Sequence, residues 1–259
     1  MTSTSSESTS PGSPTQPAGE SLLASVNSPD DLKKLSDEEL LSLAEEVRHT
    51  LINCLSKTGG HLGPNLGVVE LSIALHAVFS TPIDKILFDV SHQGYVHKML
   101  TGRANAIDGI RTFKGLNGYF LRTESEHDAY GAGHAGTALS AALGMAAARD
   151  LSGGDNHVIA VAGDAAFTCG PTLEALNNIA ETTKKFIVVL NDNEWSIDKN
   201  VGAIARYFNA LQTHSTYATV RTTSADFVEK ILGKAARKIA HRVEEGAKNL
   251  IFPNVLFEK

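Results

Sequence analysis

The chain has 259 residues, of which 42% are hydrophobic and 20% charged, a composition typical of a globular protein with a large core. The formal net charge of -6 argues against non-specific binding to nucleic acid, which requires a basic face. No apolar run approaches the length of about eighteen residues that a membrane span needs, and two distant cysteines, Cys54 and Cys169, suit a reduced cytoplasmic protein better than a disulfide scaffold.

The first twenty residues are rich in Ser, Thr and Pro and contain no Lys or Arg. They lack the basic and apolar segments of a secretory signal, and Glu7 and Glu20 do not fit an Arg-rich transit peptide. We therefore predict a disordered tail over residues 1–27 and an ordered domain over residues 28–259.

Helical spacing of apolar residues begins after Ser36 and Glu39, which together form a capping-box pattern, and the helix should end at Gly59 and Gly60. A second helix is predicted over residues 67–79. A short buried strand follows at residues 86–88 and ends at Asp89. The polar stretch 102–130 has no clear periodicity.

Further helices are predicted over residues 137–149 and 171–183, and strands over residues 158–162 and 186–190. Strands that alternate with helices of this length indicate an α/β fold, with a parallel sheet flanked by helices. Periodicity fades over residues 198–224, where loops are expected, and a last helix is predicted over residues 227–248.

Polar residues follow two of these strands directly: Gly163 and Asp164 follow one, and Asn191, Asp192 and Asn193 follow the other. Because the carboxyl ends of parallel strands lie at one edge of the sheet, the side chains of Asp164 and Asn193 should converge. Carboxylate, amide and carbonyl oxygens suit Mg²⁺ that carries a phosphate-bearing ligand. Asp and Asn also cap helices and close turns after strands, so either residue alone has an ordinary structural explanation.

Several segments in series carry a family resemblance. The segment GDAAFTCG followed by LNDNEWSI resembles the metal-binding motif of thiamine-diphosphate enzymes, in the form found in the 1-deoxy-D-xylulose-5-phosphate synthase family. Four other segments are similar to that family over roughly residues 30–258: residues 59–76, 89–103, 123–137 and 196–202. The resemblance implies a thiamine-diphosphate-binding domain of the diphosphate type.

The resemblance also implies roles for individual residues. Mg²⁺ would be bound by Asp164, Asn193 and the backbone carbonyl of Trp195. Residues beside the cofactor would be His92, Gly133, His134, Ala135, Ala165, Ala166 and Asn193. His61 and His92 would face the thiazolium and the substrate, where an imidazole can shuttle protons or donate hydrogen bonds. Arg111 would hold the phosphate of the acceptor sugar.

The sequence departs from the family pattern at small residues. Ser91 replaces a frequent Gly, Ala135 and Gly136 replace a frequent pair of Ser residues, and Ala165 replaces a Gly. Trp195 takes a position that is often Met. Of the ten histidines, His61 and His92 are assigned contact with the thiazolium and the substrate, and His134 a place beside the cofactor.

Residues 131–136 also fit the G-x-G-x-x-G dinucleotide pattern. That pattern should follow a strand, whereas the residues before it are charged, so we do not interpret it as a nicotinamide site.

The family reaction condenses pyruvate with glyceraldehyde 3-phosphate and releases CO₂, and its product feeds isoprenoid, thiamine and pyridoxal synthesis. A pyrimidine-binding domain completes the site in this family, and the resemblance assigns none of the 259 residues to it. We therefore expect low activity from the chain alone, with a homodimer or a pyrimidine-domain partner chain as the active form. The alternatives are the N-terminal subunit of a split transketolase and a non-catalytic thiamine-diphosphate-binding fragment.

Overall fold

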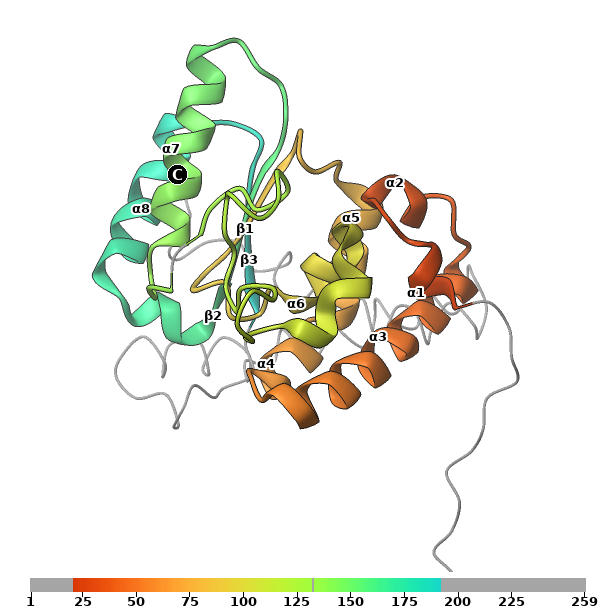
Figure 1. The fold of residues 1–259 in the computed structure, drawn as a ribbon. Helices are drawn as coiled ribbons and strands as arrows, with labels where there is room; N and C mark the ends of the chain where they lie inside the picture. The colour runs from red at the N-terminus through yellow and green to blue at the C-terminus, as the bar shows by residue number, and fades with distance from the viewer. Residues whose placement is uncertain (1–20, 132, 192–259) are drawn as a thin grey trace, which may run out of the picture.

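A computed structural model of the chain describes residues 21–131 and 133–191. Its centre is a parallel sheet made of β1 (Lys85–Phe88), β2 (Val158–Gly163) and β3 (Phe186–Asn191), in the order β1-β2-β3 (Figure 1). The register pairs Phe88 with Val161 and Gly163 with Asn191. The predicted α/β fold with a parallel sheet is confirmed.

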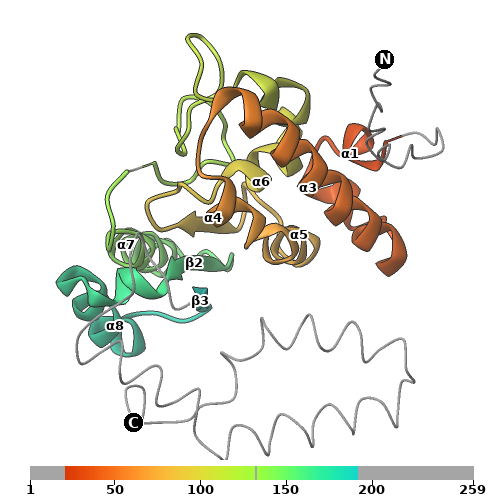
Figure 2. The ribbon, with the colours of Figure 1, turned by 90° about the horizontal axis from the view of Figure 1, so that it is seen from below.

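The two faces of the sheet are covered by different helices (Figure 2). On one face, Leu87, Val158, Ala160 and Ala162 pack against α7 (Ala138–Leu151) and α8 (Gly170–Thr182). On the other face, Ile86, Phe88, Ile159 and Val161 pack with Leu75 and Phe120. This alternation follows from the two-residue period of a strand, and it explains why the central strands read as continuous apolar runs.

The N-terminal helices form a second core beside the sheet. They are α1 (Leu22–Ser25), α2 (Pro29–Leu32), α3 (Asp37–Thr58), α4 (Leu62–Leu66) and α5 (Val69–Val78). The capping box at α3 is confirmed, because the Ser36 hydroxyl accepts from the Glu39 N–H and the Glu39 carboxylate accepts from the Ser36 N–H. Gly59 ends α3 with a φ of 68°, a conformation that favours glycine.

Two boundaries differ from the sequence prediction. Residues 22–25, which were assigned to the tail, form α1, where Leu23 is buried and Glu46 of α3 accepts hydrogen bonds from the Leu22 and Leu23 N–H groups. The helix predicted over residues 67–79 begins only at Val69, and a separate short helix, α4, precedes it. The predicted loops at 198–224 and the helix at 227–248 lie outside the described residues.

Between β1 and α7 the chain forms α6 (Tyr95–Lys98), a kinked turn η1 (Met99–Arg103) and a 3₁₀ helix η2 (Ala104–Gly109). Residues 110–130, called the pocket loop below, then run without regular structure, as the lack of periodicity predicted. A second 3₁₀ helix, η3 (Asp164–Thr168), joins β2 to α8. None of the described helices is long and apolar enough to cross a membrane.

Candidate functional site

Asp164 lies where β2 ends, at the edge of the sheet that the sequence predicted. It is the first residue of η3 and is buried, with 8% of its surface exposed. Because Gly163 pairs with Asn191, strand β3 ends at the same edge. Ala165 is half-buried and Ala166 is buried on the same turn. Asn193 and Trp195 lie outside the described residues, so the predicted convergence with Asp164 stays a prediction.

The segment 133–135 is exposed, and the residue that follows it contacts the turn after Asp164. The contact is made by Gly136, whose φ of 77° favours glycine; a Cβ built there would lie 2.4 Å from the Cβ of Cys169. The Thr172 hydroxyl also donates to the Gly136 carbonyl, at 3.4 Å. A side chain at 136 would push these segments apart, so the Gly that replaces a family Ser here fits the close packing.

The carboxylate of Asp89 caps the N-terminus of α7. It accepts from the backbone N–H groups of Gly136 at 2.9 Å, Thr137 at 3.0 Å and Ala138 at 3.0 Å. These are the donors that a dinucleotide phosphate would use at the end of a G-x-G-x-x-G loop. Since a carboxylate of the protein already takes them, the glycine pattern at 131–136 does not offer a dinucleotide phosphate site.

His61 and His92 lie together, as the resemblance implied. Their rings meet edge to face with centroids 5.4 Å apart. Burial and the neighbouring Arg111 lower the pKa of His61. Burial and His61 lower the pKa of His92, and Asp89 offsets part of that effect. Both imidazoles therefore favour the neutral form, in which each ring has one hydrogen-bond donor and one acceptor.

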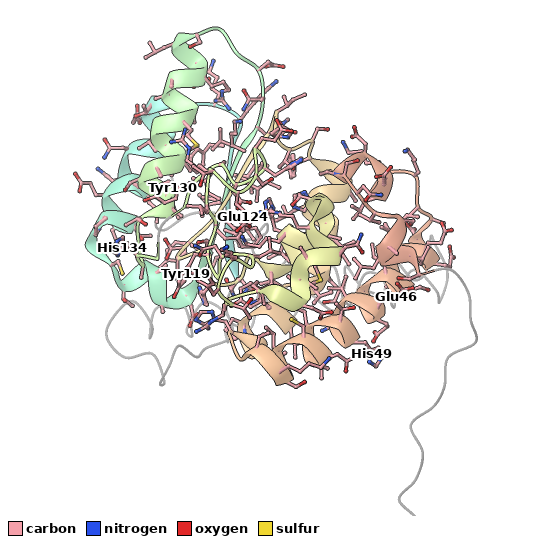
Figure 3. The ribbon with its side chains drawn as sticks, in the orientation of Figure 1. Glu46, His49, Tyr119, Glu124, Tyr130 and His134 are labelled. Carbon is pink, nitrogen blue, oxygen red and sulfur yellow. The ribbon has the colours of Figure 1, made fainter. Side chains whose placement is uncertain are left out.

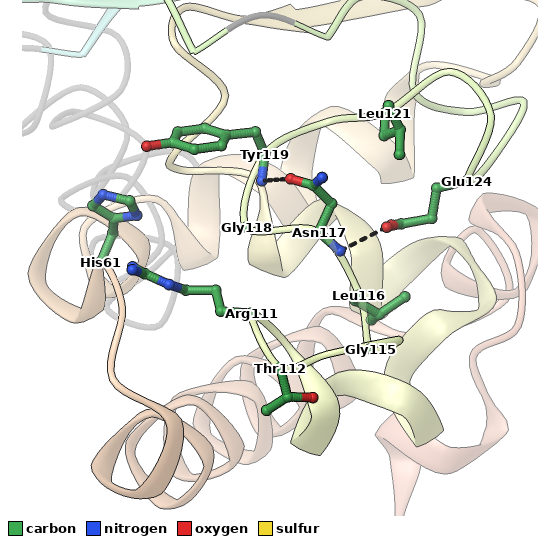
Figure 4. A pocket seen from close by; sticks show the side chains of 10 residues that line it. All are labelled: His61, Arg111, Thr112, Gly115, Leu116, Asn117, Gly118, Tyr119, Leu121 and Glu124. Carbon is green, nitrogen blue, oxygen red and sulfur yellow. Dashed lines mark hydrogen bonds between the residues drawn. The ribbon is translucent and has the colours of Figure 1, made fainter.

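A pocket of about 370 Å³ opens between His61 and the pocket loop (Figure 4). Its lining residues are His61, Arg111, Thr112, Gly115, Leu116, Asn117, Gly118, Tyr119, Leu121 and Glu124. In Figure 4 the Arg111 guanidinium and the His61 imidazole extend toward the same space, with the Tyr119 ring across from them. The structure thus brings two of the three implied catalytic residues into one pocket, and the third, His92, contacts the ring of His61.

The pocket also adjoins the predicted cofactor segment. A Cβ built on Gly133 would lie 3.8 Å from the ring of Tyr119, an ordinary van der Waals contact. Figure 3 shows Tyr119 and the neighbouring His134 on the same side of the molecule. The exposed segment 133–135 and the pocket therefore share a border at Tyr119.

Arg111 is held by a tight turn at the start of the pocket loop. Its backbone N–H donates to the Leu116 carbonyl at 2.8 Å, and its φ of 64° is unusual for a residue with a side chain. A Cβ built on Gly115 would lie 1.8 Å from the Gly109 carbonyl oxygen, so only glycine fits this turn. Such local strain recurs where a side chain must be aimed at a ligand.

Buried charges hold the rest of the pocket loop against α6 and η1. Asp128, 1% exposed, accepts two hydrogen bonds from Arg103, at 2.7 and 3.0 Å, and one from the Leu121 N–H at 3.0 Å. Glu124 pairs with Lys98 and with Arg103, and its second oxygen accepts from the Asn117 N–H at 2.7 Å. Two carboxylates thus fix the backbone of the pocket wall at residues 117 and 121.

Histidines extend this network into the core. His97 Nε2 lies 3.2 Å from Asp128 Oδ1, and His97 Nδ1 lies 2.9 Å from His76 Nε2. Burial lowers the pKa of His97 to about 4, although Asp128 acts in the opposite direction. Burial raises the pKa of Asp128, but hydrogen bonds from His97 and Arg103 outweigh that effect and hold the pKa below its ordinary value.

Sequence reasoning assigned no role to four residues that shape this site: Asn65, Tyr95, Asp89 and Glu124. Asn65 and Tyr95 contact the two histidines, Asp89 caps α7, and Glu124 holds the pocket wall. All four lie inside the segments that carried the resemblance, at 59–76, 89–103 and 123–137. For Asn65 the signal was a polar residue among largely apolar neighbours at 62–69, whereas Glu124 lies in a polar stretch that gave no such signal.

Comparison with known proteins gives three consistent results. Residues 23–259 match the family model for the N-terminal part of 1-deoxy-D-xylulose-5-phosphate synthase. Enzymes of that name from Methylacidiphilum infernorum and Acidobacterium capsulatum are 60% and 59% identical over 93% and 92% of this chain. The chain spans 38% of the length of each of these relatives.

Among solved structures, the transketolase from Leishmania mexicana is similar with a TM-score of 0.55 and 20% sequence identity. The match covers 68% of this chain and 31% of that one. At this identity the likeness concerns the fold, and it agrees with the parallel sheet and flanking helices described above.

Proposed function

The chain belongs to the 1-deoxy-D-xylulose-5-phosphate synthase family, and on that premise we propose that it forms the diphosphate-binding part of a thiamine-diphosphate transferase. The proposed reaction condenses pyruvate with glyceraldehyde 3-phosphate and releases CO₂. The observation that carries the proposal is the common edge of β2 and β3, where Asp164 follows β2 and the segment 133–136 packs beside it.

The residues at this edge fit the proposed cofactor. Asp164, Asn193 and the Trp195 carbonyl would hold Mg²⁺ through hard oxygen ligands. The exposed residues Gly133, His134 and Ala135 would lie along the diphosphate, together with Ala165 and Ala166 of the turn after β2. When bound, thiamine diphosphate supplies an acidic thiazolium carbon that serves as the nucleophile toward pyruvate.

The pocket residues are proposed to handle the acceptor. Arg111 carries a planar cation with paired N–H donors, which matches the oxygens of a phosphate monoester. His61 lines the same pocket, and the ring of His92 lies 5.4 Å from the ring of His61. The three side chains therefore would orient glyceraldehyde 3-phosphate and donate or accept protons near its carbonyl group.

Because the relatives are longer than this chain, we propose that sequence matching their remaining part supplies the pyrimidine-binding half of the site. That part would come from the same polypeptide or from a partner chain, and two copies would form a homodimer. The domain assignment of residues 28–259, extended to begin at Ser21, is part of this proposal. The relatives at 59% and 60% identity favour the synthase over a split transketolase.

Calorimetry with thiamine diphosphate tests the cofactor assignment. We expect binding that requires Mg²⁺ and is lost with a chelator, and at least a tenfold weaker affinity in Asp164→Ala because a charged metal ligand is removed. Asp108→Asn, at an exposed aspartate, is the matched control and should bind normally. Binding that survives both the chelator and Asp164→Ala would refute the proposed metal site.

Steady-state kinetics test the acceptor assignment in the chain combined with the pyrimidine-binding part of a relative. Arg111→Ala should raise KM for glyceraldehyde 3-phosphate by roughly tenfold or more, since a hydrogen bond to a charged group contributes about 1.5–3 kcal/mol. KM for pyruvate should change much less. Arg122→Ala, on the same loop but outside the pocket lining, is the control. Equal effects of the two substitutions would contradict the assignment.

A further inference from the structure

Asn65 joins the two segments that carry the paired histidines. It is fully buried at the end of α4, and its amide N–H groups donate to the His61 carbonyl and to the His92 carbonyl, both at 2.8 Å. Its amide oxygen accepts from the Tyr95 N–H at 2.9 Å. One side chain therefore fixes the backbone at both histidines and at Tyr95, because a buried amide loses free energy if any of these bonds breaks.

Tyr95 in turn contacts the imidazole of His61. The tyrosine is fully buried, and its hydroxyl lies 3.2 Å from His61 Nδ1. Cβ atoms built on Gly60 and Gly118 would lie 3.1 and 3.7 Å from this hydroxyl, so backbone encloses it. Within residues 21–131 and 133–191, His61 Nδ1 is its hydrogen-bond partner.

The direction of this hydrogen bond follows from the donors and acceptors available. A phenol O–H is a donor that needs an acceptor when it is buried, and leaving it unsatisfied costs about 1–3 kcal/mol. Neutral imidazole offers a lone pair on one nitrogen and an N–H on the other. If the tyrosine donates to Nδ1, the proton of the neutral ring must be on Nε2.

We propose that Tyr95 is a positioning residue that fixes the neutral form of His61 with its proton on Nε2, so that His61 acts in the pocket as a hydrogen-bond donor beside Arg111. Both groups then donate toward the same space, which favours a ligand rich in oxygen acceptors, such as a phosphate ester or a carbonyl that gains negative charge (Figure 4). The role of His61 in acceptor binding rests on the proposed function. The assignment of its proton to Nε2 does not depend on that function.

The lowered pKa of His61 agrees with this assignment. The groups that face the ring are Arg111, His92, Tyr95 and Tyr119. Burial and Arg111 both disfavour the imidazolium, so the neutral ring and its tautomer are the relevant state near neutral pH. A hydrogen bond donated by Tyr95 to Nδ1 exists only in the neutral ring, and it acts in the same direction.

Nuclear magnetic resonance of the 259-residue chain labelled with ¹⁵N at histidine tests the proposal without cofactor or substrate. The long-range ¹H–¹⁵N spectrum should show His61 protonated on Nε2 alone. Tyr95→Phe removes the hydroxyl, and it should raise the pKa of His61 by up to about one unit, because a neutral hydrogen bond contributes about 0.5–1.5 kcal/mol.

Tyr119→Phe is the matched control, since the ring of Tyr119 is 5.9 Å from that of His61 but its hydroxyl makes no hydrogen bond to His61 in the described structure. It should leave the pKa of His61 where it is in the wild type. A proton on Nδ1 in the wild type would overturn the proposal, as would a pKa that falls or stays constant in Tyr95→Phe. If Tyr95→Phe does not fold, the wild-type tautomer alone decides. Because no ligand is added, these outcomes are independent of any failure to bind thiamine diphosphate.

Discussion

The sheet region, which comprises β1, β2, β3, α7 and α8, and the pocket loop at 110–130 are held in place by different interactions. In the sheet region, small and branched apolar side chains interlock, and Ala142, Ala146 and Ala160 are fully buried where α7 meets β2. In the pocket loop, the half-buried carboxylate of Glu124 and the buried carboxylate of Asp128 bind Lys98, Arg103 and backbone N–H groups.

The pocket loop shows how a segment without regular secondary structure can be held in one conformation. A loop has no ladder of backbone hydrogen bonds, so its exposed backbone must be fixed by side chains that satisfy it. Charged groups do this with strong, directional bonds, but each one depends on its partner remaining present and charged. The pocket loop should therefore be more sensitive than the sheet region to changes of single charges and to pH.

The largest effect is expected from Asp128→Ala. It leaves Arg103 without both of its Asp128 hydrogen bonds and removes the acceptor of the Leu121 N–H. Removal of one partner from a buried ion pair typically costs about 3–5 kcal/mol. The free energy of unfolding, measured with urea, provides the test. Asp108→Asn should change it by less than about 0.5 kcal/mol, as exposed substitutions do. Similar free energies of unfolding for the two variants would contradict the view that buried charges hold the pocket loop in place.

The next largest effect is expected in the pH dependence of the free energy of unfolding. His97 has an ordinary pKa of 6.5 and a folded pKa of about 4, so between these values the unfolded chain binds a proton that the folded chain does not. Stability is therefore lost as the pH falls through this range, by an amount on the order of 3 kcal/mol from His97. In His97→Gln this share of the pH dependence should disappear.

The matched control for that titration is His49→Gln, because His49 is an exposed histidine on α3. Urea unfolding of the wild type and the two variants at several pH values between 7 and 4 gives the slope of the free energy of unfolding against pH. If His97→Gln keeps the wild-type slope, the buried histidine is not what makes the pocket loop region sensitive to pH.

An intermediate effect is expected at Gly136, where the segment 133–136 meets α8. Alanine there would combine a left-handed φ of 77° with a clash against Cys169. Gly153 has a φ of 70° and open space around it, so Gly153→Ala carries the backbone strain alone. Thermal or urea unfolding should show Gly136→Ala to be less stable than Gly153→Ala by about 1–3 kcal/mol, the usual cost of overpacking. Equal stabilities of the two variants would mean that residues 133–136 can move away from Cys169 at no cost in free energy.

The smallest effect belongs to the sheet region alone. Gly144 lies exposed within α7, and a Cβ built there would meet nothing within 4 Å. Gly144→Ala should stabilise the fold by about 0.5–1 kcal/mol, because glycine loses more chain entropy in a helix. The substitution should leave the pH dependence unchanged, which the same unfolding series measures. A loss of stability would indicate that α7 packs differently from the description above.

The two regions also differ in how far their sequence predicts them. Local periodicity and caps were enough for α3, α7, α8 and the three strands, since each depends on neighbours a few residues away. The pocket loop depends on pairs such as Lys98 with Glu124, which are 26 residues apart, and no spacing rule indicates them. Helix α4 was missed for the same reason, because Asn65 bonds to residues 92 and 95 of a distant segment.

For the candidate site, residue chemistry predicted the sheet edge at Asp164, and the family resemblance supplied Arg111 and the two histidines. Composition misplaced the start of the ordered chain, because the polar residues around Leu23 and Val26 concealed two buried side chains. Whether Asn193 completes a metal site with Asp164 stays a prediction, since residue 193 lies beyond the described range.

The cap that Asp89 places on α7 has an electrostatic consequence. A helix N-terminus carries partial positive charge that ordinarily attracts anions, but here a negative side chain of the protein already neutralises it. An anionic ligand beside residues 133–135 therefore gains little attraction from the N-terminus of α7, so the neutralisation of its charge falls to other groups. The divalent ion proposed at Asp164 would supply part of that neutralisation.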